Sequence, residues 1–190
     1  MSEDRYIYDL SEGDATMRNL LGGKGAGVAE MNRVGVPVPD AFTVTTTACV
    51  QTMKRKGEWP EGLADQIAAG LARLEERTGR KLGGSEKPLL VSVRSGAVHS
   101  MPGMMDTILN LGISDESVAA VAEESGNERF AWDCYRRFIH MYGEVVENIP
   151  GRHAAVLAVA VAGAQGGGEF DAHRRLRRIG GQGESALGQP

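Results

Sequence analysis

Residues 90–112 read LVSVRSGAVHSMPGMMDTILNLG, and no other stretch of the chain is as informative. The apolar, β-branched beginning predicts a buried strand, and Thr107–Leu111 predicts a second strand after a Pro-Gly turn. The first strand leads to Arg94 and then to a segment of small residues. A cation beside small residues at the end of a strand suits a phosphate-binding site. Composition alone leaves a surface arginine in a hairpin open as the alternative.

The overall composition narrows the classes of protein to consider. The chain has 190 residues, 42% of them hydrophobic, and a formal net charge of -4. These values allow one or two small domains with a real core and argue against a general nucleic-acid binder, which needs a basic face. Without a run of about 18 apolar residues we expect no transmembrane helix. Because the acidic N-terminus lacks a signal-peptide pattern, we expect a cytoplasmic protein.

Hydrophobic periodicity predicts short strands that alternate with amphipathic helices. Further strands are expected at Tyr6–Tyr8 and Phe42–Thr47, and an extended edge segment at Val36–Pro39. Alternatively, Thr45 to Thr47 cap a helix that runs through Cys49, Val50 and Met53. Helices that end at a glycine are expected at Ala26–Val34, Leu63–Thr78 and Glu116–Glu124, and a longer helix is expected at about Glu128–Val146. Since no clean βαβ repeat appears, the α+β class is expected.

Two of these helices carry more detailed expectations. Ser114 or Asp115 is expected to cap the helix over Glu116–Glu124. On the last helix, Arg136 and Arg137 are expected on the solvated face. The residues expected to be buried there are Phe130, Tyr135, Phe138, Ile139, Tyr142 and Val145. Cys49 and Cys134 lack metal-ligand spacing and are expected to be reduced and buried.

A glycine-rich loop, LLGGKGAG, is expected over Leu20–Gly27 and opens the first of these helices. Glycines let backbone amides approach phosphate oxygens, a helix N-terminus attracts anions, and Lys24 adds a mobile point charge. The loop is not a P-loop, because Gly25 follows Lys24, and Val28 breaks the G-x-G-x-x-G pattern. Glycine-rich turns before helices are common without any ligand. Lys24 together with Arg94 favours a nucleoside triphosphate, whose charges need neutralising.

The remaining candidates have simpler explanations. Met101, Met104 and Met105 could line a purine pocket, although methionines more often fill gaps in a core. Asp106 alone is more often a turn or cap residue than a metal ligand. His99 has no visible partner for acid–base work and is expected to be exposed. We therefore assign no catalytic residue and no metal ligand from the sequence.

Three segments resemble, in order and spacing, the N-terminal region of the pyruvate, phosphate dikinase family. They are LLGGKGAGVAEMNRVGVPVPDAFTVTTTAC (20–49), KPLLVSVRSGAVHSMPGMMDTILNLGI (87–113) and NERFAWDCYRRFIHMYGEVV (127–146). The resemblance covers about residues 5–149, and the run SMPGMMDTILNLG distinguishes this family from the related phosphoenolpyruvate synthases. It implies the first part of an ATP-grasp nucleotide-binding domain. The family enzyme interconverts ATP, phosphate and pyruvate with AMP, diphosphate and phosphoenolpyruvate.

The resemblance also implies roles for individual residues. Lys24 and Arg94 correspond to the family lysine and arginine that contact the ATP phosphates, and they stabilise charge while Mg²⁺ bridges the oxygens. The segment Ser100–Thr107 resembles the part of the family domain that closes over the nucleotide. The candidates for contacts in the nucleotide loops are Gly23, Gly25, Ser100, Met101, Gly103, Met104, Asp106 and Thr107.

The last 40 residues depart from the family pattern. We expect residues 1–150 to be the N-terminal portion of the ATP-grasp domain. Residues 151–190 contain no lysine and are rich in Ala, Gly and Arg, so a low-complexity tail, disordered or read in a shifted frame, is expected.

The family enzyme is several times longer than this chain. The second half of the grasp with its Mg²⁺ ligands, a phosphohistidine domain, a pyruvate-binding barrel and homodimer formation are implied for that enzyme. No nucleic-acid or membrane partner is expected. The chain is thus expected to be a truncated fragment that binds ATP and turns nothing over alone. The alternative is a non-catalytic remnant or regulatory piece that binds a partner.

Overall fold

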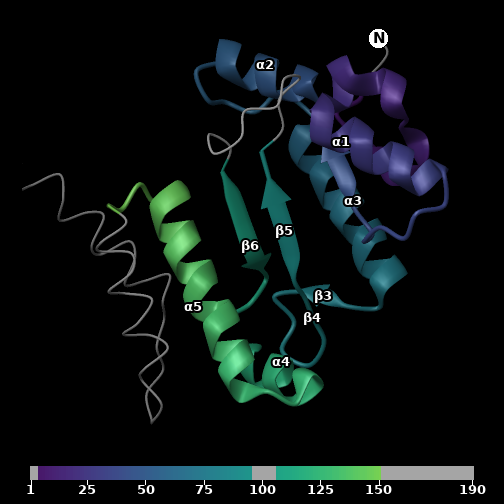
Figure 1. Cartoon of the computed structure of the whole chain (residues 1–190). Coiled ribbons are helices and arrows are strands. Elements are labelled where there is room, and N and C mark those ends of the chain that lie inside the picture. The colour runs from purple at the N-terminus through teal and green to yellow at the C-terminus, as the bar shows by residue number, and fades with distance from the viewer. Residues whose placement is uncertain (1–3, 96–105, 151–190) are drawn as a thin grey trace, which may run out of the picture. The chain divides into compact units, whose positions relative to one another are not determined.

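The computed structural model of the chain describes residues 4–95 and 106–150 (Figure 1). Among these residues, helices mix with three two-stranded sheets, which confirms the α+β class. The chain divides into two compact units. Of the described residues, 4–79 and Ser95 belong to the first unit, and 80–94 and 106–150 belong to the second.

The first unit is built around a short antiparallel pair of strands, β1 (Ile7–Asp9) and β2 (Phe42–Val44). In this pair Ile7 lies opposite Val44, and Asp9 lies opposite Phe42. The unit's helices are α1 (Arg18–Arg33), α2 (Thr46–Lys54) and α3 (Leu63–Thr78), and its 3-10 turns are η1 (Leu10–Glu12) and η2 (Ala15–Met17).

A small apolar cluster and a set of hydrogen bonds hold this unit together. Tyr6, Ala48 and Leu63 are buried against one another. The Tyr6 amide donates to Oε1 of Gln66 at 2.8 Å, and its hydroxyl donates to Oε1 of Gln51 at 2.9 Å. These contacts join the start of β1 to α2 and α3, so the strand pair is covered by helices that follow it in the chain.

The second unit contains two strand pairs and two helices. β5 (Val91–Arg94) pairs antiparallel with β6 (Thr107–Leu111), and β3 (Lys81–Leu82) pairs parallel with β4 (Pro88–Leu89). Its helices are α4 (Val118–Ser125) and α5 (Glu128–Val145). Figure 1 shows α5 running alongside β6.

One face of α5 forms the core of the second unit. Residues at helical spacing on this face are buried: Ala131, Cys134, Tyr135, Ile139 and Gly143. All of them except Gly143 pack against Ile113, which follows β6, and against Val118 and Val121 of α4. A fully buried branched side chain contributes about 1.5–3 kcal/mol, so this face supplies much of the unit's stability.

Several predicted elements are confirmed in detail. α3 and β6 span the predicted residues, and β1 differs by one residue. The glycines expected to end helices have left-handed backbones, with φ of 81° at Gly35, 65° at Gly79 and 63° at Gly126. Arg136 and Arg137 of α5 both pair with Asp133, one turn earlier, as expected for a solvated face.

Other predictions for the first unit are wrong. Val36–Pro39 belongs to no strand. β2 ends at Val44, and Thr45 caps α2 because its hydroxyl accepts a hydrogen bond from the Ala48 amide at 3.3 Å. The sequence left a helix cap at Thr45 open as the alternative to a strand that continues to Thr47. The cap is favoured because it gives a hydrogen-bond acceptor to an amide that the first turn of a helix leaves without a partner.

Three predictions for the second unit also need correction. The strand expected to be buried, β5, is half-buried at Val91 and exposed from Ser92 to Arg94. α4 begins later than expected, at Val118, and Ser117 at its N-cap position makes no side-chain cap bond. Ser114 caps the turn before the helix, in line with the expectation, because its hydroxyl accepts from the Ser117 amide at 3.2 Å and its own amide donates to the Ser117 hydroxyl at 2.8 Å. Phe130 is 52% exposed, although burial was expected. It lies in the first turn of α5, where the helix borders an open recess.

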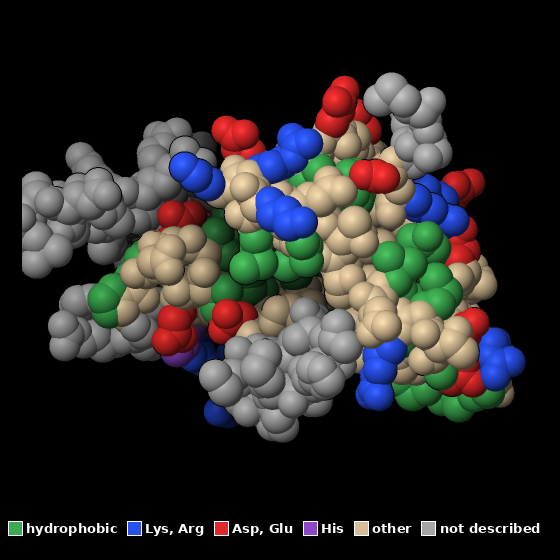
Figure 2. Space-filling view, turned by 90° about the horizontal axis from the view of Figure 1, so that it is seen from above, with side chains coloured by type: hydrophobic (Ala, Val, Ile, Leu, Met, Phe, Trp, Pro, Cys, Tyr) green, Lys and Arg blue, Asp and Glu red, His purple; other side chains and the backbone are tan. Residues whose placement is uncertain are grey.

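Figure 2 shows the charged side chains of the described residues from one side. On the face seen in Figure 2, acidic and basic side chains are interspersed, which agrees with the modest net charge of -4. Among the described residues, no helix is both long and apolar enough to cross a membrane. Nor do three or more His, Cys, Asp or Glu side chains of residues 4–95 and 106–150 group together as they would to hold a metal ion.

Candidate functional site

A single glycine interrupts α1. Gly22 has φ 71° and ψ 168°, a backbone conformation open essentially only to glycine. The predicted loop over Leu20–Gly27 is therefore wrong in extent, because its other residues are helical. The helix restarts after Gly22, so Gly23, Lys24 and Gly25 occupy a first turn, where backbone amides lack helical partners and attract anions.

Lys24 projects from this turn. Its side-chain Nζ donates a hydrogen bond to the backbone carbonyl of Ser95 at 3.1 Å. An ammonium group has three donors, so this bond leaves two of them for another acceptor. Sequence reasoning missed Ser95, because a backbone carbonyl is present at every position and leaves no signal in the sequence.

Gly25 has a packing role. A Cβ atom at this position would lie 2.9 Å from Cγ2 of Thr43 in the segment β2, which is closer than real Cβ atoms approach. At Gly27, in contrast, a Cβ atom would meet nothing within 4 Å. Gly25 thus allows α1 to lie directly on β2, and this contact fixes the turn that carries Lys24.

Arg94 is the last residue of β5 and is exposed. Its antiparallel partner in β6 is Thr107, which the exposed Asp106 precedes. The structure therefore brings Arg94 and Thr107 together. The candidates Ser100, Met101, Gly103 and Met104 lie outside the described residues, as do His99 and Met105.

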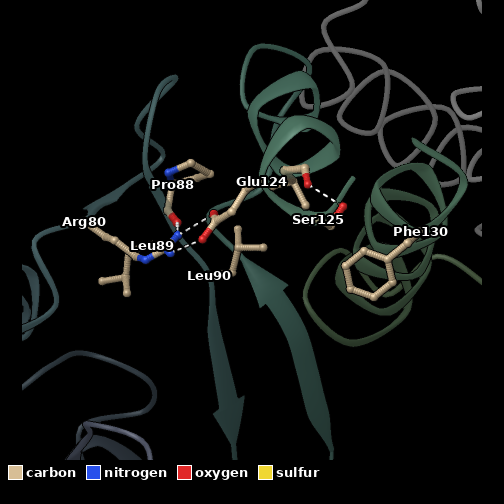
Figure 3. A pocket seen from close by; sticks show the side chains of 8 residues that line it. Arg80, Pro88, Leu89, Leu90, Glu124, Ser125 and Phe130 are labelled. Carbon is tan, nitrogen blue, oxygen red and sulfur yellow. Dashed lines mark hydrogen bonds and ion pairs between the residues drawn. The ribbon is translucent and has the colours of Figure 1, made fainter. Parts of the chain in front are cut away.

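The second unit also has an open recess of about 430 Å³ (Figure 3). Leu89, Leu90 and Phe130 contribute apolar surface to it. Nη1 of Arg80 donates to Oε2 of Glu124 at 2.9 Å, and this bond lowers the pKa of the Glu124 carboxyl. Because the two charges neutralise each other, the recess offers no free cation to an anionic ligand.

None of the site residues predicted from the sequence lines this recess. Its lining residues are Arg80, Pro88, Leu89, Leu90, Val121, Glu124, Ser125 and Phe130. The Ser125 hydroxyl donates to the Val121 carbonyl at 2.7 Å and so serves its own helix. The candidates for phosphate chemistry therefore remain Lys24 in the first unit and Arg94 in the second unit.

Comparison with known proteins identifies the relatives of this chain. Residues 18–78 match the family model described as pyruvate phosphate dikinase, AMP/ATP-binding domain. A pyruvate, phosphate dikinase from Clostridium symbiosum is 53% identical over 149 residues, or 78% of this chain and 17% of the relative. The chain is homologous to part of the pyruvate, phosphate dikinases. A dikinase from Entamoeba histolytica is 49% identical over 143 residues, or 75% of this chain and 16% of the relative.

The same similarity extends to plant dikinases. The chloroplastic pyruvate, phosphate dikinase 1 of Zea mays is 55% identical over 140 residues, which are 74% of this chain and 15% of the relative. The chain thus spans about a sixth of the length of the curated dikinases that it matches. The matched residues 18–78 run from the first residue of α1 to the last residue of α3 and include Lys24.

Proposed function

We propose that this chain supplies part of an ATP-grasp nucleotide-binding domain, in which Lys24 and Arg94 bind the phosphates of ATP. The observation that carries the proposal is the position of Lys24, on the first turn of a helix that restarts after Gly22, within a segment matching an AMP/ATP-binding domain. Within the whole dikinase, this domain would serve the conversion of ATP, phosphate and pyruvate to AMP, diphosphate and phosphoenolpyruvate.

The two cations would act in different ways. The Lys24 ammonium, with one donor held by Ser95, would place a point charge beside the phosphates. The Arg94 guanidinium, exposed at the end of β5, presents a planar fork that matches two phosphate oxygens at once. Mg²⁺ that arrives with the nucleotide would neutralise further phosphate charge. Both side chains thus stabilise negative charge on the bound phosphates.

The remaining expectations from the sequence stay predictions. They include the nucleotide contacts from Gly23, Gly25 and Ser100–Thr107, and the division into a domain portion over residues 1–150 and a tail over 151–190. We also keep as proposals the interaction with phosphohistidine and pyruvate-binding domains of a whole dikinase, a homodimeric state, and a cytoplasmic location.

Titration calorimetry with MgATP on the 190-residue chain tests the phosphate-binding role. We expect Lys24→Met and Arg94→Ala each to weaken binding by about 1.5–3 kcal/mol, the range for a hydrogen bond to a charged group. Arg129→Ala is the matched control, because Arg129 is also exposed and lies on α5, outside the proposed site.

Two results would contradict the proposal. If the unaltered chain binds no MgATP, the nucleotide-binding function is wrong for this chain. If Arg94→Ala binds as tightly as Arg129→Ala while Lys24→Met loses affinity, the function stands and the role of Arg94 is wrong.

A further inference from the structure

Asn110 has an unusual backbone for a residue within a strand. Its φ is 58°, in the left-handed region that non-glycine residues seldom occupy. The strands β5 and β6 change register here, between Val91 and Val93. Val91 lies opposite Leu111, and Val93 lies opposite Ile108. Two steps along β5 thus match three steps along β6, so β6 holds one extra residue in a bulge.

The bulge is tied to the core helix of the unit. Nδ2 of Asn110 donates to the backbone carbonyl of Cys134 in α5 at 3.3 Å, and the Asn110 carbonyl accepts from the Ile113 amide at 3.1 Å. Cys134 and Ile113 are both buried. An asparagine tolerates the left-handed conformation better than most residues, and its amide adds a bond that glycine could not make.

The strand pairs beyond the bulge depend on this extra residue. They are Val93 with Ile108 and Arg94 with Thr107. Because side chains alternate between the two faces of a strand pair, a slip of one residue would change which β6 residue and which face accompany Arg94. The bulge therefore determines the surroundings in which the Arg94 guanidinium is presented.

We propose that Asn110 is a positioning residue, which holds β6 in the register that presents Arg94 to a phosphate. This inference rests on the proposed phosphate-binding role of Arg94. Asn110 touches no phosphate itself. It acts through the backbone pair of Arg94 and Thr107, and the left-handed conformation is the property that a substitution must keep.

Three variants separate backbone conformation from general destabilisation. Asn110→Val disfavours the left-handed conformation, Asn110→Ala does so more mildly, and Asn110→Gly keeps it freely available. Tyr135→Phe is the control, because it removes a hydrogen bond of 2.8 Å to Asp115 in the same unit and substitutes no residue of β6.

MgATP calorimetry and NMR contacts across the β5–β6 pair are measured on each variant. We expect Asn110→Val and Asn110→Ala to lose the contact between Arg94 and Thr107 and to bind MgATP about tenfold more weakly, the cost of one misaligned charge-assisted bond. Asn110→Gly should keep the contact and bind within about threefold of the unaltered chain, as should Tyr135→Phe.

The outcomes decide the inference even if a variant unfolds. Should Asn110→Val fail to fold, Asn110→Ala gives the comparison. Unchanged pairing in Asn110→Ala, or lost pairing with unchanged MgATP affinity, would overturn the inference. If Arg94→Ala binds MgATP as well as the unaltered chain, the proposed function of Arg94 fails, and the NMR contacts alone then decide whether Asn110 sets the register.

Discussion

At the scale of single residues, the two cysteines lie in different environments. Cys49 is exposed on α2, whereas Cys134 is buried on α5, where burial raises the pKa of its thiol. The expectation that both thiols are buried is wrong for Cys49, because α2 buries the neighbouring Ala48 instead. Since the thiolate is the reactive form of cysteine, the two side chains should differ in reactivity.

We predict that iodoacetamide modifies Cys49 about tenfold or more faster than Cys134 at pH 8, because Cys134 is both shielded and less ionised. Mass spectrometry of peptides from a time course measures the two rates. In urea the rates should become similar, since both thiols are then exposed. Similar rates in the folded chain would contradict the burial of Cys134.

At the scale of elements, the contact of α1 with β2 depends on Gly25 and not on the nearby Gly27. Gly25 faces Thr43 across a gap too small for a methyl group, whereas Gly27 faces open space. Glycine in a helix costs about 0.5–1 kcal/mol relative to alanine when nothing requires it. The two positions therefore form a matched pair within a single helix.

We predict opposite effects of the same substitution at these positions. Gly27→Ala should raise the free energy of unfolding by about 0.5–1 kcal/mol, and Gly25→Ala should lower it by about 1–3 kcal/mol through overpacking. Urea denaturation measures both values. Adding Thr43→Ser to Gly25→Ala removes the Cγ2 atom in the way and should restore part of the loss. Stabilisation by Gly25→Ala would show that α1 does not lie as described.

At the scale of the whole molecule, each unit has its own buried cluster. Tyr6, Ala48 and Leu63 form that of the first unit, and the face of α5 around Ile139 forms that of the second. Ile139 is only 1% exposed. Compact units with separate cores can lose protection separately when one core is damaged.

We predict that Ile139→Ala destabilises the second unit by about 2–5 kcal/mol, the cost of removing a large core side chain. In hydrogen-exchange mass spectrometry, amides of α5 should lose protection while amides around Ala48 in α2 keep theirs. Ala48→Val is the reciprocal variant, and it should affect α2 first. Equal loss of protection in both units after either substitution would show that they unfold as one.

Local patterns accounted for much of the fold and for part of the candidate site. The helical spacing of apolar residues from Leu63 to Thr78 and the glycine at position 79 predicted α3 with its bounds, because both signals act within a few residues along the chain. Lys24 and Arg94 could be selected as phosphate-binding candidates from the sequence. A lysine among glycines, and an arginine between a predicted strand and a segment of small residues, are both visible in the order of residues. Phe130 was misjudged, because its exposure depends on how far other elements cover the first turn of α5.

The sequence by itself determined the α+β class, the amphipathic helices, the β5–β6 pair and the relationship to dikinases, since these follow from periodicity, capping residues and motifs. Only the tertiary structure decided that Gly22 alone bends α1, that Lys24 reaches the Ser95 carbonyl, and that Asn110 inserts a bulge held by Cys134. These features join residues far apart in the chain or depend on a single backbone angle. Residue type and spacing specify neither a contact between distant residues nor the backbone angle of one residue.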